Sequence, residues 1–282
     1  MTAVIYEKRD YIVYITLNRP EVHNAMNPEM VVRLAEAWLQ FDADPEARVA
    51  IITGAGDQAF SAGADLKRLI PLMTRAREPE DEWDRRVLEE RIDGVRLLDI
   101  ALMRLRPLYK PVIAAINGWC LAGGTELALA TDIRIAAEHA SLGLMEPKRG
   151  LVPGGGSMAR LPRQIPYCKA MEILLTGDPI PAQEAYRIGL VNYVVPLAEL
   201  MPTAERFART IAENGPLAVR KIKETVIRSS GVPLEEAYRL ENEASAVIMR
   251  SEDAREGARA FAENPQGWLV LRGGTGCGKT HL

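Results

Sequence analysis

The chain has 282 residues, of which 48% are hydrophobic and 26% are charged. This ordinary globular composition excludes collagen-like, intrinsically disordered and coiled-coil proteins. The net charge of −3 argues against a nucleic-acid-binding protein, and no apolar run approaches the roughly 18 residues that span a membrane. The N-terminal residues carry no secretory or transit signal. We therefore expect a globular protein of the cytoplasm.

In chain order, the N-terminal half predicts alternating strands and helices. β-Branched and aromatic residues predict two strands, over residues 4–8 and 11–17, that form a hairpin. Asn27 and Pro28 then provide the N-cap and first-turn proline of a helix with a regular apolar face. Further elements follow: strands over 49–53, 111–117 and 133–136, and a helix over 124–130.

The rest of the chain is predicted to be mainly helical. Residues 75–91 are dense in charges of both signs, and Pro79 precedes what the pattern predicts to be a solvated helix. From Pro181 onward the predicted helices cover 181–188, 196–214, 216–229, 233–249 and 252–263. Alternating strands and helices followed by helices alone indicate an α/β fold with a helical C-terminal part.

Few residues suggest metal or nucleophilic chemistry. The three cysteines are widely spaced without a CxxC pair, and the three histidines show no metal-ligand spacing. Ser157 lies in GGGSMA, which has the wrong register for the GxSxG nucleophile of a hydrolase. We therefore expect carboxylates to supply any acid–base chemistry, with no metal.

Two segments each place a glycine turn after an apolar strand: AFSAGADL at 59–66 and NGWCLAGGTELALATD at 117–132. Small residues in such turns leave backbone N–H groups unblocked. Two N–H groups that converge on one point would stabilise a developing oxyanion. Either turn alone is more often a plain connection between a strand and a helix, so the pair carries the argument.

These segments, together with NRPEVHNAMN at 18–27 and SEDAREGARAFAE at 251–263, resemble the crotonase superfamily, the enoyl-CoA hydratase/isomerase family, over almost the whole chain. The resemblance implies an α/β fold with a crotonase-like ββα spiral core over 1–195 and a helical C-terminal trimerisation region over 196–263. It implies a homotrimer or a dimer of trimers. It also implies an acyl-CoA thioester substrate, whose thioester oxygen would accept hydrogen bonds from the backbone N–H groups of Ala64 and Gly123.

Two acidic residues point to one reaction within this superfamily. Glu126 and Glu146 match the two catalytic glutamates of hydratases, although either alone is more often a plain helix-start or loop carboxylate. The pair implies an enoyl-CoA hydratase, in which Glu126 activates the water that attacks C3 and Glu146 protonates C2. No cofactor is expected beyond the coenzyme A of the substrate. Pro147 biases Glu146 toward extended geometry, which would tilt its carboxyl.

Other reactions stay open at this stage. They are an enoyl-CoA isomerase, an acyl-CoA dehydratase, a thioester hydrolase, or a non-catalytic scaffold that binds acyl-CoA. The segment 67–106 is long and charged where the family varies its acyl-binding wall, so the sequence does not indicate the acyl chain length.

The resemblance also implies the contacts with coenzyme A. The backbone that would receive the adenine and pantetheine belongs to Ala62, Ala64 and Leu66. The side chains near the ADP phosphates would be His23, Lys67 and Arg68, although a solvated surface carries the same residues. Phe261 matches an aromatic residue that contacts the coenzyme A of an adjacent subunit, while Asn264 stands where a lysine is expected.

Two further motifs resemble nucleotide-binding loops. GAGDQA at 54–59 imitates a dinucleotide fingerprint but is not followed by the required helix. GGTGCGKT at 273–280 satisfies the P-loop pattern and resembles the start of a helicase-loader-type ATPase domain, yet Leu282 ends the chain before the helix and sheet that such a site needs. We therefore expect residues 264–282 to be a foreign tail with an incomplete P-loop, left by a fusion or a gene-boundary error.

Overall fold

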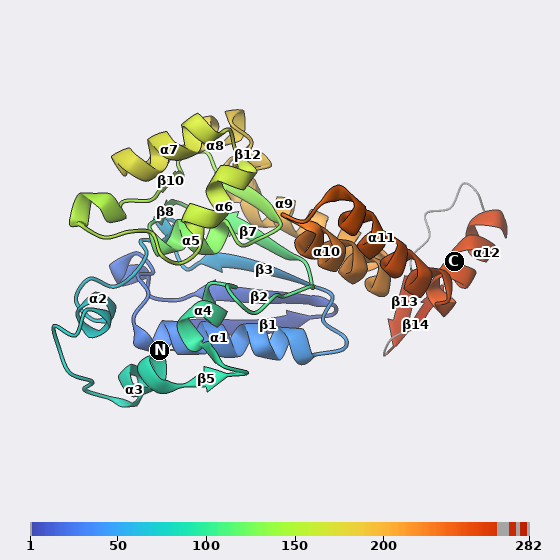
Figure 1. The fold of residues 1–282 in the computed structure, drawn as a ribbon, viewed down its shortest axis with the longest axis horizontal. Helices are drawn as coiled ribbons and strands as arrows, with labels where there is room; N and C mark the ends of the chain where they lie inside the picture. Colours follow the sequence, from blue (N-terminus) through green and yellow to red (C-terminus); the bar gives the residue numbers. More distant parts are fainter. Residues whose placement is uncertain (1, 264–270, 275–276, 281–282) are drawn as a thin grey trace.

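The computed structural model describes residues 2–263, 271–274 and 277–280. Its larger sheet has six strands, which are drawn in the centre of Figure 1. In spatial order these are β1 (Val4–Arg9), β2 (Ile12–Leu17), β3 (Val49–Gly54), β7 (Val112–Ile116), β9 (Ile133–Ala137) and β12 (Tyr193–Val195). The β1–β2 hairpin is antiparallel, as its short connection requires, and the other neighbours are parallel.

A smaller four-stranded sheet lies beside it. Its order is β11 (Ile180–Pro181), β10 (Ser141–Gly143), β8 (Trp119–Leu121) and β4 (Ala59–Ser61). β4, β8 and β10 run parallel to one another. Each follows a strand of the larger sheet in the chain, so the chain passes repeatedly from the larger sheet to the smaller one. This repeated crossing agrees with the ββα spiral that the resemblance implies.

The first long helix, α1 (Pro28–Ala43), forms for the reasons that the sequence indicates. Asn27 accepts a hydrogen bond from the Met30 N–H at 2.9 Å, and Pro28 begins the helix. Its apolar face is fully buried, and the Trp38 indole donates to the Ala101 carbonyl oxygen at 3.0 Å. This bond connects α1 to α4 (Leu97–Ala101), so both helices cover the same side of the larger sheet.

Helices also cover the smaller sheet and the opposite side of the larger one. α6 (Ser157–Gln164), α7 (Tyr167–Thr176) and α8 (Ala182–Arg187) lie over the smaller sheet in Figure 1, after the short helix α5 (Gly123–Ala128). α9 (Leu197–Glu213) packs on β3, β7 and β9 through a row of small buried side chains. The sequence analysis did not predict α6, α7 or the short strands of the smaller sheet.

The three following helices extend away from both sheets at the right of Figure 1. They are α10 (Pro216–Ser229), α11 (Leu234–Met249) and α12 (Glu252–Glu263), close to their predicted bounds. α10 buries none of its side chains, although Ile222 and Val226 are apolar. Within the described part of the chain, no helix combines the length and the apolar character needed to cross a membrane.

The charged segment that follows β4 differs from the solvated helix that its sequence predicts. It folds into α2 (Leu69–Met73), α3 (Glu82–Glu89) and a short hairpin of β5 (Arg91–Ile92) and β6 (Val95–Arg96). α3 is not simply solvated, because Asp84 and Val87 are buried.

The P-loop-like tail is only partly described. Residues 264–270, 275–276 and 281–282 lie outside the described residues. The described remainder, β13 (Leu271–Gly274) and β14 (Cys277–Thr280), forms an antiparallel pair. A P-loop requires a strand, a loop and then a helix, so this strand pairing gives no support to the resemblance to an ATPase.

Candidate active site

Three parallel strands of the smaller sheet bring the predicted site residues together. β4, β8 and β10 are neighbours, so their carboxyl ends lie at one edge of the sheet. Ala64 follows β4, Gly123 follows β8 and Glu146 follows β10. All three line one cleft of about 920 Å³. The arrangement explains why residues more than eighty positions apart in the sequence share a site.

The backbone around Ala64 exposes one N–H group to this cleft. Met26 donates to the Gly63 carbonyl oxygen at 2.8 Å and accepts from the Asp65 N–H at 2.9 Å. Because successive N–H groups alternate in direction, the Ala64 N–H points away from Met26. It finds no acceptor within the part of the chain that the structure describes. Gly63 supports the turn with a φ of +89°, which favours glycine.

The second exposed N–H belongs to Gly123. Ala122 holds a φ of +49°, an uncommon value for a residue with a side chain, and its N–H donates to the Gly143 carbonyl oxygen at 2.7 Å. This turn starts α5, so the Gly123 N–H has no acceptor inside its own helix. A Cβ placed on Gly123 would lie 3.6 Å from the Ala64 nitrogen. The two N–H groups are therefore neighbours across the cleft.

Glu126 lies in α5 with its side chain buried and one carboxylate oxygen anchored. Its Oε1 accepts hydrogen bonds from the Gly155 N–H at 2.6 Å and from the Ser157 hydroxyl at 2.9 Å. Burial raises the pKa of Glu126, while these donors and the Arg160 guanidinium oppose the rise. Glu126 lines the cleft, and its Oε2 accepts no hydrogen bond from the residues that the structure describes.

Glu146 occupies a different environment. Its Oε2 is buried and has no hydrogen-bond partner among the described residues. Burial raises the pKa of Glu146 to about 7, and the neighbouring Glu126 carboxylate adds to this rise. Pro147 does not hold Glu146 in extended backbone as expected, because Glu146 is the first residue of the 3₁₀ helix η2 (Glu146–Arg149). The Glu146 backbone is therefore part of a tight turn.

The residues predicted to contact coenzyme A lie along the same cleft. Those that line it are His23, Ala62, Ala64, Leu66, Lys67 and Arg68. The His23 ring contacts the exposed Trp119 ring, with 4.9 Å between centroids. Phe261 belongs to α12, and its side chain lies outside the described residues.

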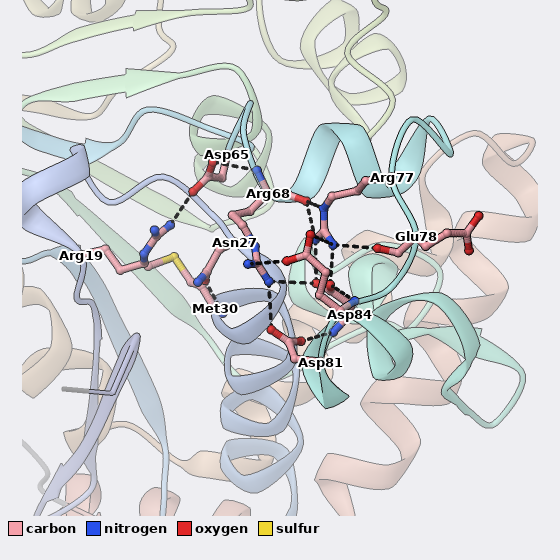
Figure 2. A network of polar contacts seen from close by, with 10 residues as sticks. Arg19, Asn27, Met30, Asp65, Arg68, Arg77, Glu78, Asp81 and Asp84 are labelled. Atoms are coloured by element: carbon pink, nitrogen blue, oxygen red, sulfur yellow. Dashed lines mark hydrogen bonds and ion pairs between the residues drawn. The ribbon is translucent and has the colours of Figure 1, made fainter.

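Arg68 is less available to a phosphate than the sequence suggests. Its guanidinium donates to Asp81 at 2.9 Å and to Glu80 at 3.1 Å, and Figure 2 shows the contact with Asp81. Beside it, Arg77 binds the fully buried Asp84 through both terminal nitrogens. These ion pairs connect α2, which lines the cleft, to α3, so Arg68 supports the wall of the cleft.

Two residues near Glu126 were not recognised from the sequence. Gly155 lines the cleft, and a Cβ on it would lie 2.4 Å from Glu126 Oε2. Ser157, considered only as a nucleophile, instead donates to the Glu126 carboxylate. The run of glycines at 154–156 before a helix is the signal that predicts such a close backbone approach. No group of three or more potential metal ligands occurs in the described ranges.

Comparisons with known proteins identify the family of this chain. A family model described as enoyl-CoA hydratase/isomerase matches residues 7–268. The chain is 41% identical to enoyl-CoA hydratase EchA19 of Mycobacterium tuberculosis, over 92% of this chain and 93% of that protein. It is also 41% identical to a carnitinyl-CoA dehydratase of Salmonella paratyphi A, over 89% of this chain and 92% of that one.

Solved structures show the same relationship. A crystal structure of an enoyl-CoA hydratase from Mycobacterium tuberculosis H37Rv superposes with a TM-score of 0.81 at 41% identity, covering 93% of this chain and 96% of that one. Sequence and fold thus agree over almost the full length, which includes both exposed N–H groups and both glutamates. The chain belongs to the enoyl-CoA hydratase/isomerase family, whose members are crotonase-type enzymes.

Proposed function

We propose that this protein is an enoyl-CoA hydratase, which adds water reversibly across the 2,3 double bond of a 2-enoyl-CoA to give a 3-hydroxyacyl-CoA. The observation that carries the proposal is the presence of Glu126 and Glu146 in one cleft with the N–H groups of Ala64 and Gly123. Hydration needs a base for water, an acid for C2 and a site for negative charge on the thioester oxygen. The cleft supplies each of these.

The different environments of the two glutamates favour different roles. Donors to Oε1 favour the ionised form of Glu126, so Oε2 is suited to orient and deprotonate the attacking water. Glu146, with its pKa raised to about 7, is protonated in a substantial fraction of molecules near neutral pH and is suited to deliver that proton to C2. The charge that develops on the thioester oxygen would be held by the two N–H groups. One such donor is typically worth about 10²–10³ in rate.

The cleft also fits the remaining parts of the substrate. Apolar side chains from α2 and from the segment after η2 form a wall for an acyl chain, including Ile70, Met73 and Leu151. Lys67 at the rim of the cleft is a candidate phosphate contact, because its ammonium has no ion pair among the described residues. We propose no cofactor beyond the coenzyme A of the substrate.

We further propose a homotrimer, or a dimer of trimers, assembled through the helical region 196–263 beyond the catalytic core 1–195. Ile222, Val226 and Leu234 each expose more than 60% of their surface on α10 and α11. Apolar side chains at this density on helices that leave the core are typical of an interface. Phe261 would then lie near the coenzyme A of an adjacent subunit. Size-exclusion chromatography with light scattering measures the assembly directly.

A second candidate is dehydration or isomerisation of another acyl-CoA at the same site. The 41% identity to a protein named carnitinyl-CoA dehydratase supports it. Dehydration is the reverse of hydration and would use the same two carboxyl groups. Thioester hydrolysis is less well supported, because it has no use for a proton donor at C2.

The test is a panel of 2-enoyl-CoA substrates of different chain lengths, with loss of the conjugated thioester absorbance and product analysis as readouts. Hydration predicts loss of absorbance and a 3-hydroxyacyl product. A shifted double bond would identify an isomerase, and free coenzyme A a hydrolase. Binding without turnover of any substrate would indicate a non-catalytic scaffold and contradict the proposal.

A further inference from the structure

Arg160 lies in the first turn of α6 and contacts two segments that contribute residues to the cleft. Its guanidinium donates to the Met103 carbonyl oxygen at 2.6 Å and to the Leu102 carbonyl oxygen at 3.3 Å. A longer contact of 3.5 Å reaches the Gly155 carbonyl oxygen. The Leu102 and Met103 carbonyls follow the end of α4, where helix carbonyls lack intrahelical partners. One cation therefore connects the end of α4 to the glycine loop.

The glycine loop contacts the Glu126 carboxylate, and the end of α4 packs against this loop. The Gly155 N–H donates to Glu126 Oε1 at 2.6 Å. A Cβ on Gly155 would meet Glu126 Oε2 at 2.4 Å on one side and Leu102 Cδ1 at 2.6 Å on the other. The loop is thus packed closely against both Glu126 and Leu102, at the end of α4. Leu102 itself lines the cleft.

The backbone that follows α4 adopts strained φ angles. Met103 has a φ of +47° and Leu105 a φ of +61°, values that residues with side chains rarely adopt. Strain of this kind persists only when neighbouring groups hold the backbone in place. The short contact from Arg160 to the Met103 carbonyl is such a restraint.

The charge of Arg160 also acts on Glu126. The guanidinium favours the ionised carboxylate and lowers the pKa of Glu126, against the effect of burial. The other charged groups around this pair are Glu146, which repels the same carboxylate, and Arg104, which lies near Arg160. Glu126 therefore faces one carboxyl group and one guanidinium in its immediate surroundings.

We propose that Arg160 is a positioning residue for Glu126: its guanidinium fixes the glycine loop against the end of α4, and its positive charge complements the negative charge of the water-activating carboxylate. The inference rests on the proposed hydratase activity. It concerns two separable properties, the place of the carboxylate and its charge. Arg160 is not among the residues that line the cleft, so its role is that of a positioning residue and not of a catalytic one.

Two substitutions separate these properties. Arg160→Gln removes the charge but retains a side-chain donor. We expect kcat to fall about tenfold, which corresponds to roughly 1.4 kcal/mol of transition-state stabilisation. The acid limb of the kcat/KM profile should move to higher pH, since Glu126 then ionises less readily. Arg160→Lys retains the charge but cannot span the carbonyls, so kcat should fall while the acid limb stays in place.

Arg163→Gln is the matched control, because Arg163 lies one turn further along α6 and is exposed. It should leave both kcat and the pH profile unchanged. A purely structural role for Arg160 would lower kcat and the melting temperature of both variants without moving the acid limb of Arg160→Gln. That result would overturn the proposal.

A second readout keeps the inference separate from the reaction. A titration of glutamate labelled with ¹³C at the carboxyl, followed by NMR, reports the pKa of Glu126 without turnover, and Glu126→Gln assigns its signal. The pKa should be higher in Arg160→Gln than in the wild-type protein. If the wild-type protein hydrates no enoyl-CoA but this shift is found, only the proposed function fails. An unchanged pKa overturns the role of Arg160.

Discussion

The tight contact between Gly155 and Glu126 gives the sharpest test of the active-site geometry. A Cβ at position 155 would lie 2.4 Å from Glu126 Oε2 and 2.7 Å from its Cδ. Real Cβ contacts essentially never fall below 3.0 Å, and ordinary van der Waals contact begins at 3.4 Å. The same Cβ would lie only 2.6 Å from Leu102 Cδ1. Gly155→Ala must therefore displace the Glu126 carboxyl.

The size of this displacement sets the expected loss of activity. Opening a contact from 2.4 Å to 3.4 Å moves the carboxyl by about 1 Å. A misplacement of this size in a catalytic group costs about a hundredfold in rate, or roughly 2.7 kcal/mol of transition-state stabilisation. We expect the loss to fall mainly on kcat, because Glu126 acts on water and the thioester-binding residues are unchanged.

Gly154→Ala is the matched control in the same loop. The nearest atom to a Cβ at Gly154 is the Val152 carbonyl oxygen, at 3.9 Å, so an alanine fits without displacement. Hydration of a 2-enoyl-CoA is followed by the loss of conjugated thioester absorbance, with the melting temperature of each variant measured in parallel. Equal kcat for the two alanine variants would refute the argument that Gly155 fixes Glu126.

Three further substitutions test other parts of the structure. Glu146→Gln should lower kcat by about 10²–10⁴, because it removes the proton donor to C2; unchanged turnover would contradict this role. The pKa of Glu146 is raised to about 7, so ionisation of this carboxyl destabilises the folded state at pH values above its ordinary pKa. In thermal melts, Glu146→Gln should therefore be more stable than wild type above pH 7 but not below about pH 4. Ser157→Ala removes a donor to Glu126 Oε1 and should move the acid limb of kcat/KM to higher pH; a fixed limb would exclude this hydrogen bond as a determinant of ionisation. Asp84→Asn should lower the free energy of unfolding by about 3 kcal/mol in urea titrations, because it leaves the Arg77 guanidinium without its buried ionised partner. The control Glu78→Gln, at an exposed residue, should have little effect.

Local sequence was sufficient where a structure depends on neighbouring residues. Asn27 and Pro28 begin α1 as predicted, because capping involves groups within one turn. The helices α9, α10 and α11 also lie close to their predicted bounds, because a proline at the cap or first position marks each start locally. The P-loop-like pattern in the last residues shows the limit of such matching, because its described residues form paired strands instead of a loop before a helix.

The resemblance of ordered motifs identified the family and a set of site residues before any geometry was known. The structure brings the described members of that set to one cleft. Their chemical roles remain proposals that the substitutions above test. The sequence did not reveal Gly155, Ser157 or Arg160, since each acts through a contact with a residue far away in the chain.

What the sequence by itself determined was composition, most long elements and the family. Only the tertiary structure decided how the site is assembled. β4, β8 and β10 are three residues long each, and their sequences carry no reliable strand signal. They form because they pair with one another in parallel, and this pairing is non-local. It brings Ala64, Gly123 and Glu146 to one cleft, and so converts three scattered segments into one candidate active site.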